Sequence, residues 1–222
     1  MSLQKQKREY GDFQTPLPLA SLVCTLLKRI HPIPLTIVEP TCGEGSFLEA
    51  AIRAFGSTPT YYGFDINPEH IAHARANLSP SLQVCLQTQD FFAFDWQGFL
   101  KTKKTPLLFL GNLPWVTNAS IGECEGSNLP PKTNLKELAG ISAKTGKANF
   151  DISEWMLLKL VEAAQGQPFT IATLCKTGVA RKVLEYCWKH EIVPTETSLH
   201  RIDALKWFGA SVDACLFFAH FQ

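Results

Sequence analysis

The chain of 222 residues is 45% hydrophobic and carries a formal net charge of +1, so it can bury one large core and presents no overall basic field for nucleic acid. Its apolar runs are far shorter than the roughly 18 residues of a membrane span, and its polar N-terminus lacks the apolar core of a signal peptide. We therefore expect a single soluble, cytoplasmic domain over residues 1–222 that meets any nucleic acid through a local patch.

Hydrophobic periodicity along the chain alternates between a helical and an extended pattern. The alternation predicts an α/β fold with a mostly parallel, doubly wound seven-stranded sheet, helices on both faces and an antiparallel C-terminal strand. The predicted helices cover residues 17–30, 46–55, 68–78, 152–164 and 178–190, and the predicted strands cover residues 35–40, 60–66, 81–90, 105–112, 168–176, 195–202 and 212–221.

Residues 117–150 depart from this alternation, because they are polar, rich in Gly, Asn and Lys, and too long for an ordinary connection. A long irregular segment beside a site is a candidate substrate-binding loop or lid. Its lysines either contact phosphates or belong to an ordinary solvated loop; they are Lys132, Lys136, Lys144 and Lys147.

Metal and disulfide chemistry find little support in the sequence. The seven cysteines form no CxxC pair, and the six histidines lack the spacing of a ligand set. We expect reduced thiols and no metal site.

Ligands of an open parallel sheet bind beyond the carboxyl ends of the strands, so the residues at these ends are the candidate site residues. Gly43 and Gly45 follow the first predicted strand and allow a tight turn. Asp65 ends the second strand about twenty residues later, the distance at which an acid accepts hydrogen bonds from a ribose. Asp90 ends the third strand, where a carboxylate can accept from an adenine amino group. Each acid alone also fits a helix cap or a turn, but together with Glu39 at the end of the first strand they make three at consecutive strand ends, which favours a nucleoside site.

The ligand predicted for this site is not a dinucleotide. A third glycine is missing, and the carboxylate of Glu39 stands at the strand end where it would repel a phosphate. A cationic ligand, such as one with an ammonium and a sulfonium, suits that field better.

The fourth predicted strand is followed by the segment GNLPW, residues 111–115. Asn and Pro are common in turns, and Trp commonly fills the edge of a core. Taken alone, the segment is equally compatible with a turn and with a substrate site.

The resemblance to a known family rests on five segments in this order: YGDFQTPLPLA, EPTCGEGSF, FDIN, QDFF and GNLPW. Together they resemble the class I S-adenosylmethionine-dependent methyltransferases, and more narrowly those that methylate adenine at N6 in DNA. The resemblance covers almost the whole chain and implies a Rossmann-like fold that uses S-adenosylmethionine. It assigns the cofactor contacts to Thr15, Pro16, Glu39, Cys42, Gly43, Gly45, Asp65, Ile66, Asp90, Phe91 and Asn112.

The same resemblance places the target base at the family's Asn-Pro-Pro-Tyr motif, which maps to Asn112, Leu113, Pro114 and Trp115. The N6 amine of adenine is a poor nucleophile, because its lone pair is delocalised into the ring. The amide oxygen of Asn112 and the carbonyl of residue 113 can accept its two N–H bonds and direct the lone pair at the methyl group. Trp115 can then stack on the base as one wall of the pocket. The family implies a phenylalanine as the opposite wall, for which Phe208 is the best match unless it is a core residue.

Leu113 departs from the family, since DNA enzymes usually have proline there and ribosomal-RNA dimethyladenosine transferases have leucine. The other segments look more like the DNA group, so DNA is favoured over RNA and a restriction-modification type system is expected. The remaining alternatives are glutamine N5 methylation in protein and a non-catalytic subunit with the same fold. Residues 1–222 are not expected to include a separate target-recognition domain. Recognition would then fall to residues 117–150, or to a domain or subunit other than this one.

Overall fold

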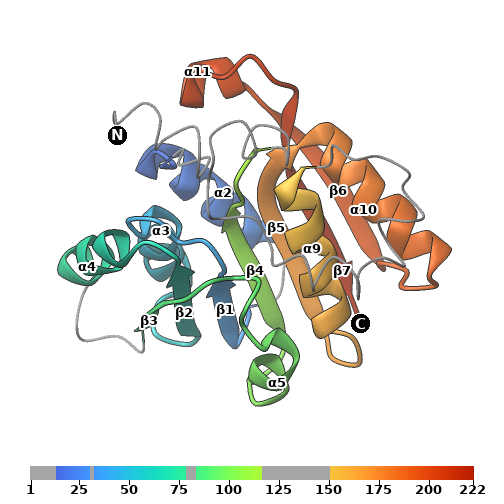
Figure 1. The fold of residues 1–222 in the computed structure, drawn as a ribbon, viewed down its shortest axis with the longest axis horizontal. Helices are drawn as coiled ribbons and strands as arrows, with labels where there is room; N and C mark the ends of the chain where they lie inside the picture. Colours follow the sequence, from blue (N-terminus) through green and yellow to red (C-terminus); the bar gives the residue numbers. More distant parts are fainter. Residues whose placement is uncertain (1–13, 31–32, 79–83, 117–150) are drawn as a thin grey trace.

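The computed structural model describes residues 14–30, 33–78, 84–116 and 151–222 (Figure 1). The predicted polar segment 117–150 and its four lysines therefore lie outside the described residues. The residues on either side of this segment are hydrogen bonded to each other, because the Ile152 N–H donates to the Val116 carbonyl at 2.9 Å.

A seven-stranded sheet with the order β3-β2-β1-β4-β5-β7-β6 runs through the middle of the molecule (Figure 1). All neighbouring strands are parallel except that β7 runs antiparallel to both β5 and β6. The predicted mostly parallel sheet with an antiparallel C-terminal strand is confirmed. The strands are β1 (Thr36–Glu39), β2 (Thr60–Asp65), β3 (Val84–Thr88), β4 (Leu107–Asn112), β5 (Phe169–Lys176), β6 (Glu196–Ile202) and β7 (Ala214–Phe221).

Helices cover both faces of the sheet, and each face has its own apolar core. The first core lies under α5 (Trp96–Lys101), α9 (Ile152–Ala163) and α10 (Thr177–Lys189). The second lies under α2 (Leu17–Ile30), α3 (Ser46–Phe55), α4 (Pro68–Asn77) and α11 (Ala204–Phe208). Because side chains alternate along a strand, the central strand β4 contributes Leu107 and Phe109 to the first core and Leu108 and Leu110 to the second. This alternation explains why β4 is apolar from Leu107 to Leu110.

The two short helices α5 and α11 were not predicted, because a single turn or two is too short for a helical period to stand out. Each nevertheless has a side-chain cap at its start. Asp95 accepts a hydrogen bond from Gly98 N–H at 2.9 Å, and Asp203 accepts one from Lys206 N–H at 3.0 Å. An aspartate three residues before the capped N–H is the signal that could have located both helices.

The packing of β2 predicts an effect of substitution at Gly63. A Cβ added there would lie 2.6 Å from Leu86 Cδ2 and 2.7 Å from Leu48 Cδ1. We expect Gly63→Ala to lower the free energy of unfolding by about 1 to 3 kcal/mol, because the core is already filled. Gly178 in α10 has nothing within 4 Å of its added Cβ and is the matched control. Gly178→Ala should be neutral or stabilise by up to about 1 kcal/mol. Urea unfolding of both variants measures the difference, and equal effects would contradict this account.

Candidate functional site

The candidate site lies at the carboxyl ends of the central parallel strands. From β1 the chain proceeds outward through β2 and β3, whereas β4 pairs on the other side of β1 and leads to β5. The adjacent ends of β1 and β4 therefore flank the point where the strand order reverses, which is where such sheets bind ligands. Glu39 ends β1 and Asn112 ends β4.

A tight turn joins β1 to α3 and depends on two glycines. Gly43 has φ +51° and Gly45 has φ +88°, in the left-handed region that favours glycine. The turn is closed by a hydrogen bond from the Gly45 N–H to the Cys42 carbonyl at 2.9 Å. Gly45 caps α3 without a side-chain hydrogen bond, so the positive end of the helix dipole begins at this turn.

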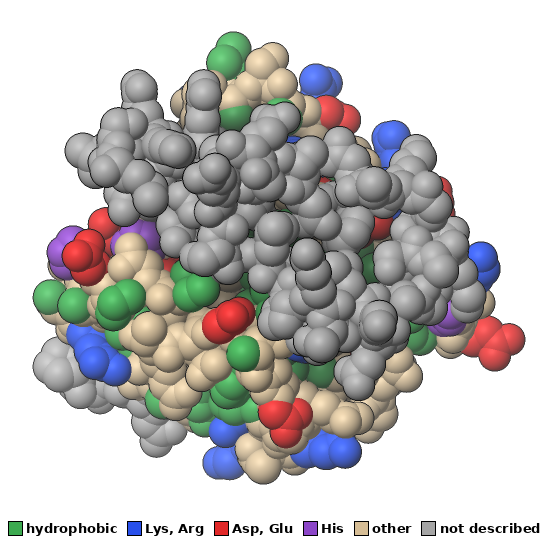
Figure 2. Space-filling view, in the orientation of Figure 1, with side chains coloured by type: hydrophobic (Ala, Val, Ile, Leu, Met, Phe, Trp, Pro, Cys, Tyr) green, Lys and Arg blue, Asp and Glu red, His purple; other side chains and the backbone are tan. Residues whose placement is uncertain are grey.

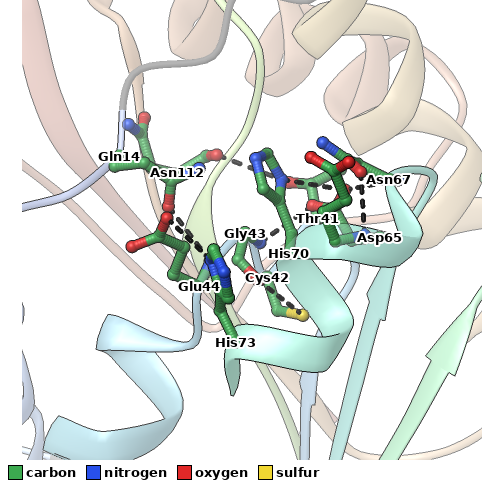
Figure 3. A network of polar contacts seen from close by, with 11 residues as sticks. Gln14, Thr41, Cys42, Gly43, Glu44, Asp65, Asn67, His70, His73 and Asn112 are labelled. Atoms are coloured by element: carbon green, nitrogen blue, oxygen red, sulfur yellow. Dashed lines mark hydrogen bonds and ion pairs between the residues drawn. The ribbon is translucent and has the colours of Figure 1, made fainter. Parts of the chain in front are cut away.

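Asp65 at the end of β2 is the hub of the polar network in Figure 3. One carboxylate oxygen, Oδ2, accepts the Gly43 N–H at 2.8 Å, and Oδ1 accepts the Asn67 N–H at 2.8 Å. The Nδ1 atom of His70 lies 3.3 Å from Oδ1. A carboxylate has roughly four acceptor positions, two on each oxygen, so Oδ2 can still accept a hydrogen bond besides that of the Gly43 N–H. The site therefore holds this carboxylate in one place and leaves it able to bind hydroxyl groups.

Glu39 occupies a very different environment from Asp65. It is only 3% exposed, and burial raises its pKa well above the usual value. The backbone N–H of Leu48 acts in the opposite direction, while the charge of Asp65 raises the pKa further. Gly111 makes the close approach of β4 to this carboxyl possible, since it has φ +139° and an added Cβ would lie 3.1 Å from Glu39 Cγ.

The segment before α2 reaches the glycine turn. The Oε1 atom of Gln14 accepts the Glu44 N–H at 3.0 Å, and Thr15 is buried at 7% exposure. The carbonyl of Pro16 accepts the N–H of Leu19 at 2.9 Å and so starts α2. Thr15 and Pro16 thus lie next to a residue that touches the turn, and their contact with a cofactor stays a prediction.

On the side of β2 and β3, the predicted adenine contacts are only partly available. Ile66 is 42% exposed, as a residue that packs on a ligand ring must be. Asp90 forms a turn in which its Oδ1 accepts the Phe92 N–H at 2.8 Å. Phe91 is 5% exposed, and its ring centroid lies 5.0 Å from that of Trp96. The ring of Phe91 therefore belongs to the core, and Ile66 is the better candidate for a ring contact.

The segment after β4 begins at the switch point and then enters the core. The Asn112 carbonyl accepts a hydrogen bond from Thr41 Oγ1 at 3.4 Å (Figure 3). Leu113 is 1% exposed, while Pro114 is partly exposed. Trp115 is 7% exposed, and its indole N–H donates to the Leu174 carbonyl at 3.4 Å.

Trp115 and Phe208 are brought together, although they lie far apart in the sequence. Their ring centroids are 5.1 Å apart with an interplanar angle of 72°, an edge-to-face contact. This contact leaves no space for a base between the rings. The predicted role of the two residues as opposite walls of a base pocket stays a prediction, which would require the rings to separate.

Several residues of this network were not predicted from the sequence, namely Gln14, Thr41, Asn67 and His70. For Asn67 a signal was available, because it caps α4 by accepting the Glu69 N–H at 2.9 Å and is followed by proline. In the space-filling view, histidine and acidic side chains gather where α4 lies (Figure 2). The Nδ1 atom of His73 on this helix lies 3.4 Å from Glu44 Oε1.

Among the described residues, no group of three or more His, Cys, Asp or Glu side chains is arranged to hold a metal ion. None of the described helices has the length and apolarity needed to cross a bilayer.

The strand order, the glycine turn after β1, the acid after β2 and the asparagine that ends β4 define the class I S-adenosylmethionine-dependent methyltransferase fold. A solved structure from Listeria monocytogenes, described as a member of that class, matches with a TM-score of 0.63 and 15% identity, over 96% of this chain and 62% of that one. The methyltransferase subunit of a type I restriction-modification system from Streptococcus thermophilus matches with a TM-score of 0.60 and 19% identity, over 95% of this chain and 45% of that one. At these identities the likeness shows the fold.

A sequence relative gives a more specific result. The chain is 41% identical over 228 residues to the Type II methyltransferase M.NspV of Nostoc sp., a match that covers 100% of this chain and 46% of that protein. The chain is thus a homologue of a Type II methyltransferase and spans less than half of that relative's length. No family model matches the chain.

The contact between Trp115 and Phe208 should be measurable as a coupling energy. We expect a double-mutant cycle with Trp115→Leu and Phe208→Leu to give about 0.5 to 1.5 kcal/mol in the free energy of unfolding. Leu205 lies on α11, as Phe208 does, but it is 65% exposed, so Leu205→Ala is the control. It should change stability by less than about 0.5 kcal/mol. Additive effects of the two ring substitutions would show that the rings do not interact.

Proposed function

We propose that the chain transfers a methyl group from S-adenosylmethionine to the N6 amine of adenine in DNA, as the modification component of a restriction-modification type system. The observation that carries this proposal is the position of Asn112. It ends β4 at the switch point, beside Glu39 and the glycine turn, and it opens the segment Asn-Leu-Pro-Trp. The identity of 41% with a Type II methyltransferase supports the same reading.

The residues at the strand ends fit S-adenosylmethionine. Glu39 Oε2 is buried and accepts no hydrogen bond from the described residues, which suits the ammonium of the methionine part. Asp65 is fixed where it can accept hydrogen bonds from ribose hydroxyls, and Ile66 is exposed beside it. A related fold, the plantazolicin methyltransferase BpumL, was solved in complex with SAH, with a TM-score of 0.55 and 12% identity, over 99% of this chain and 88% of that one. When bound, S-adenosylmethionine supplies an electrophilic methyl group on a positively charged sulfur.

In the proposed mechanism, the chain orients the target amine and needs no covalent nucleophile. The side-chain oxygen of Asn112 and the carbonyl of Leu113 accept the two N–H bonds of the amine, so that its lone pair is available on the third side. These acceptors also stabilise the positive charge that develops on the nitrogen, and a proton leaves to solvent after transfer. Positioning of the amine supplies much of the remaining acceleration.

DNA is preferred over RNA as the substrate because the relative with 41% identity is a Type II methyltransferase. RNA is retained as the second candidate on account of Leu113, and a solved 23S rRNA methyltransferase, ErmE, shares the fold with a TM-score of 0.56 and 13% identity, over 95% of this chain and 70% of that one. A panel of radiolabelled methyl transfer to DNA, RNA and protein distinguishes these substrates. Target recognition by another domain or subunit is part of the proposal.

Asp65 tests the cofactor half of the proposal. Asp65→Ala removes charge-assisted hydrogen bonds, each worth about 1.5 to 3 kcal/mol, and should weaken S-adenosylmethionine binding at least about tenfold in a calorimetric titration. Asp95 accepts the Gly98 N–H as the cap of α5, so Asp95→Ala is a control for the loss of an aspartate that holds a helix start and should leave affinity unchanged. Because Asp65 also holds the glycine turn, thermal unfolding is recorded for both variants. Normal affinity in folded Asp65→Ala would argue against a ribose contact.

Asn112 tests the catalytic half. Asn112→Ala should reduce the turnover number for methyl transfer by about a hundredfold or more, because the hydrogen-bond acceptor that orients the target amine is lost. The affinity for S-adenosylmethionine should change far less. Gln87 is an exposed amide on β3, and Gln87→Ala should retain full activity. Near-normal methylation by the Asn112 variant would reduce GNLPW to a structural turn.

A further inference from the structure

We propose that the carboxyl of Glu39 holds a proton in the ligand-free protein and releases it when a ligand ammonium binds, so that the site selects ligands with an amino group by charge exchange. The inference rests on the proposed function, because that function supplies the ligand. It adds a distinct role to Glu39, in which binding of the amino acid part is linked to pH.

Little among the described residues compensates a negative charge on Glu39. The strand that carries it is buried along its whole length, and Glu39 itself is 3% exposed. Its Oε2 atom accepts no hydrogen bond from the described residues, and none of the ion pairs found among those residues includes it. On the side of β4, Gly111 contributes backbone and no side chain. A buried carboxylate in these surroundings is costly unless it gains a proton or a cation.

The titratable groups around Glu39 are thiols and another acid. Cys24 on α2 and Cys42 in the glycine turn are buried, and the pKa of each thiol is raised by burial first and by the charge of Glu39 second. Asp65 faces it from the end of β2 and disfavours a second negative charge. From α3 the backbone N–H of Leu48 partly offsets these effects. None of these groups supplies a positive charge, so without a ligand the carboxyl of Glu39 is best neutralised by a proton.

Binding of an ammonium replaces that proton. The O–H bond of the Glu39 carboxyl breaks, the proton passes to buffer, and an N–H of the ligand donates to the carboxylate. Asp65 differs from Glu39 in its contacts, because two backbone N–H groups donate to its carboxylate.

The sign of the linkage follows from these two states. Since Glu39 has a raised pKa without ligand and a lower one beside an ammonium, affinity should rise with pH between those two values. The rise is at most about tenfold per pH unit for one released proton. Ligands without the amino group should not show it.

The experiment is isothermal calorimetry near neutral pH in buffers of low and high ionisation enthalpy. The probes are S-adenosylhomocysteine and 5′-methylthioadenosine, which lacks the amino acid part. We expect wild-type protein to release close to one proton with the first probe and none with the second. Glu39→Gln keeps the shape of the neutral carboxyl and should remove the release. Subtraction of its value also removes protons exchanged by the ligand's own amino group.

Equal proton release by wild type and Glu39→Gln would overturn the proposal. A failure of wild type to bind either probe would overturn the proposed function and, with it, the claim that a ligand ammonium displaces the proton. Thermal unfolding without ligand would still decide whether Glu39 holds a proton. A raised folded-state pKa means that stability is lost as pH rises above the usual carboxyl range, so wild type should lose stability relative to Glu39→Gln over that range. Parallel melting profiles would exclude a protonated Glu39.

Discussion

The hydrogen bond from the Gly43 N–H to the Asp65 carboxylate is the contact on which the rest of the site depends. It ties the turn that follows β1 to the end of β2. The other carboxylate oxygen holds the Asn67 N–H, and Asn67 in turn caps α4. One acidic side chain thereby fixes the turn, the strand end and the start of a helix relative to one another. Gly43 takes part because its φ of +51° aims the N–H at the acid.

The two acids at neighbouring strand ends illustrate how surroundings decide chemistry. Asp65 is surrounded by donors, and its carboxylate is a ready acceptor for hydroxyl groups. Glu39 lies against thiols and a glycine, where few donors reach it. A cofactor with a neutral sugar at one end and a charged amino acid at the other is matched by this difference. With the surroundings of Asp65 and Glu39 exchanged, the site would not match such a cofactor.

Much of the fold could be predicted from the sequence. Every predicted long helix and strand is present, because a buried face requires apolar residues at a regular spacing, and that spacing is visible in the sequence. The short helices α5 and α11 were missed, since their existence depends on capping and on packing against the sheet. The common position of Glu39, Asp65 and Asn112 could be predicted, because a parallel sheet brings its strand ends to one edge. Their roles stay predictions. The burial of Phe91 and the contact of Trp115 with Phe208 depend on tertiary packing that no local pattern encodes.

The hydrogen bond between Val116 and Ile152 has a consequence for how relatives of this protein can diverge. It closes the chain directly after the Asn-Leu-Pro-Trp segment, so β4 and α9 are joined across a narrow neck whatever lies between them. Loop-closure entropy grows slowly with length, by about 0.6 kcal/mol for each doubling. Residues between these two positions can therefore be lengthened, shortened or exchanged with little effect on the sheet. Such a neck allows natural variation in this segment while the end of β4 and the start of α9 stay in place.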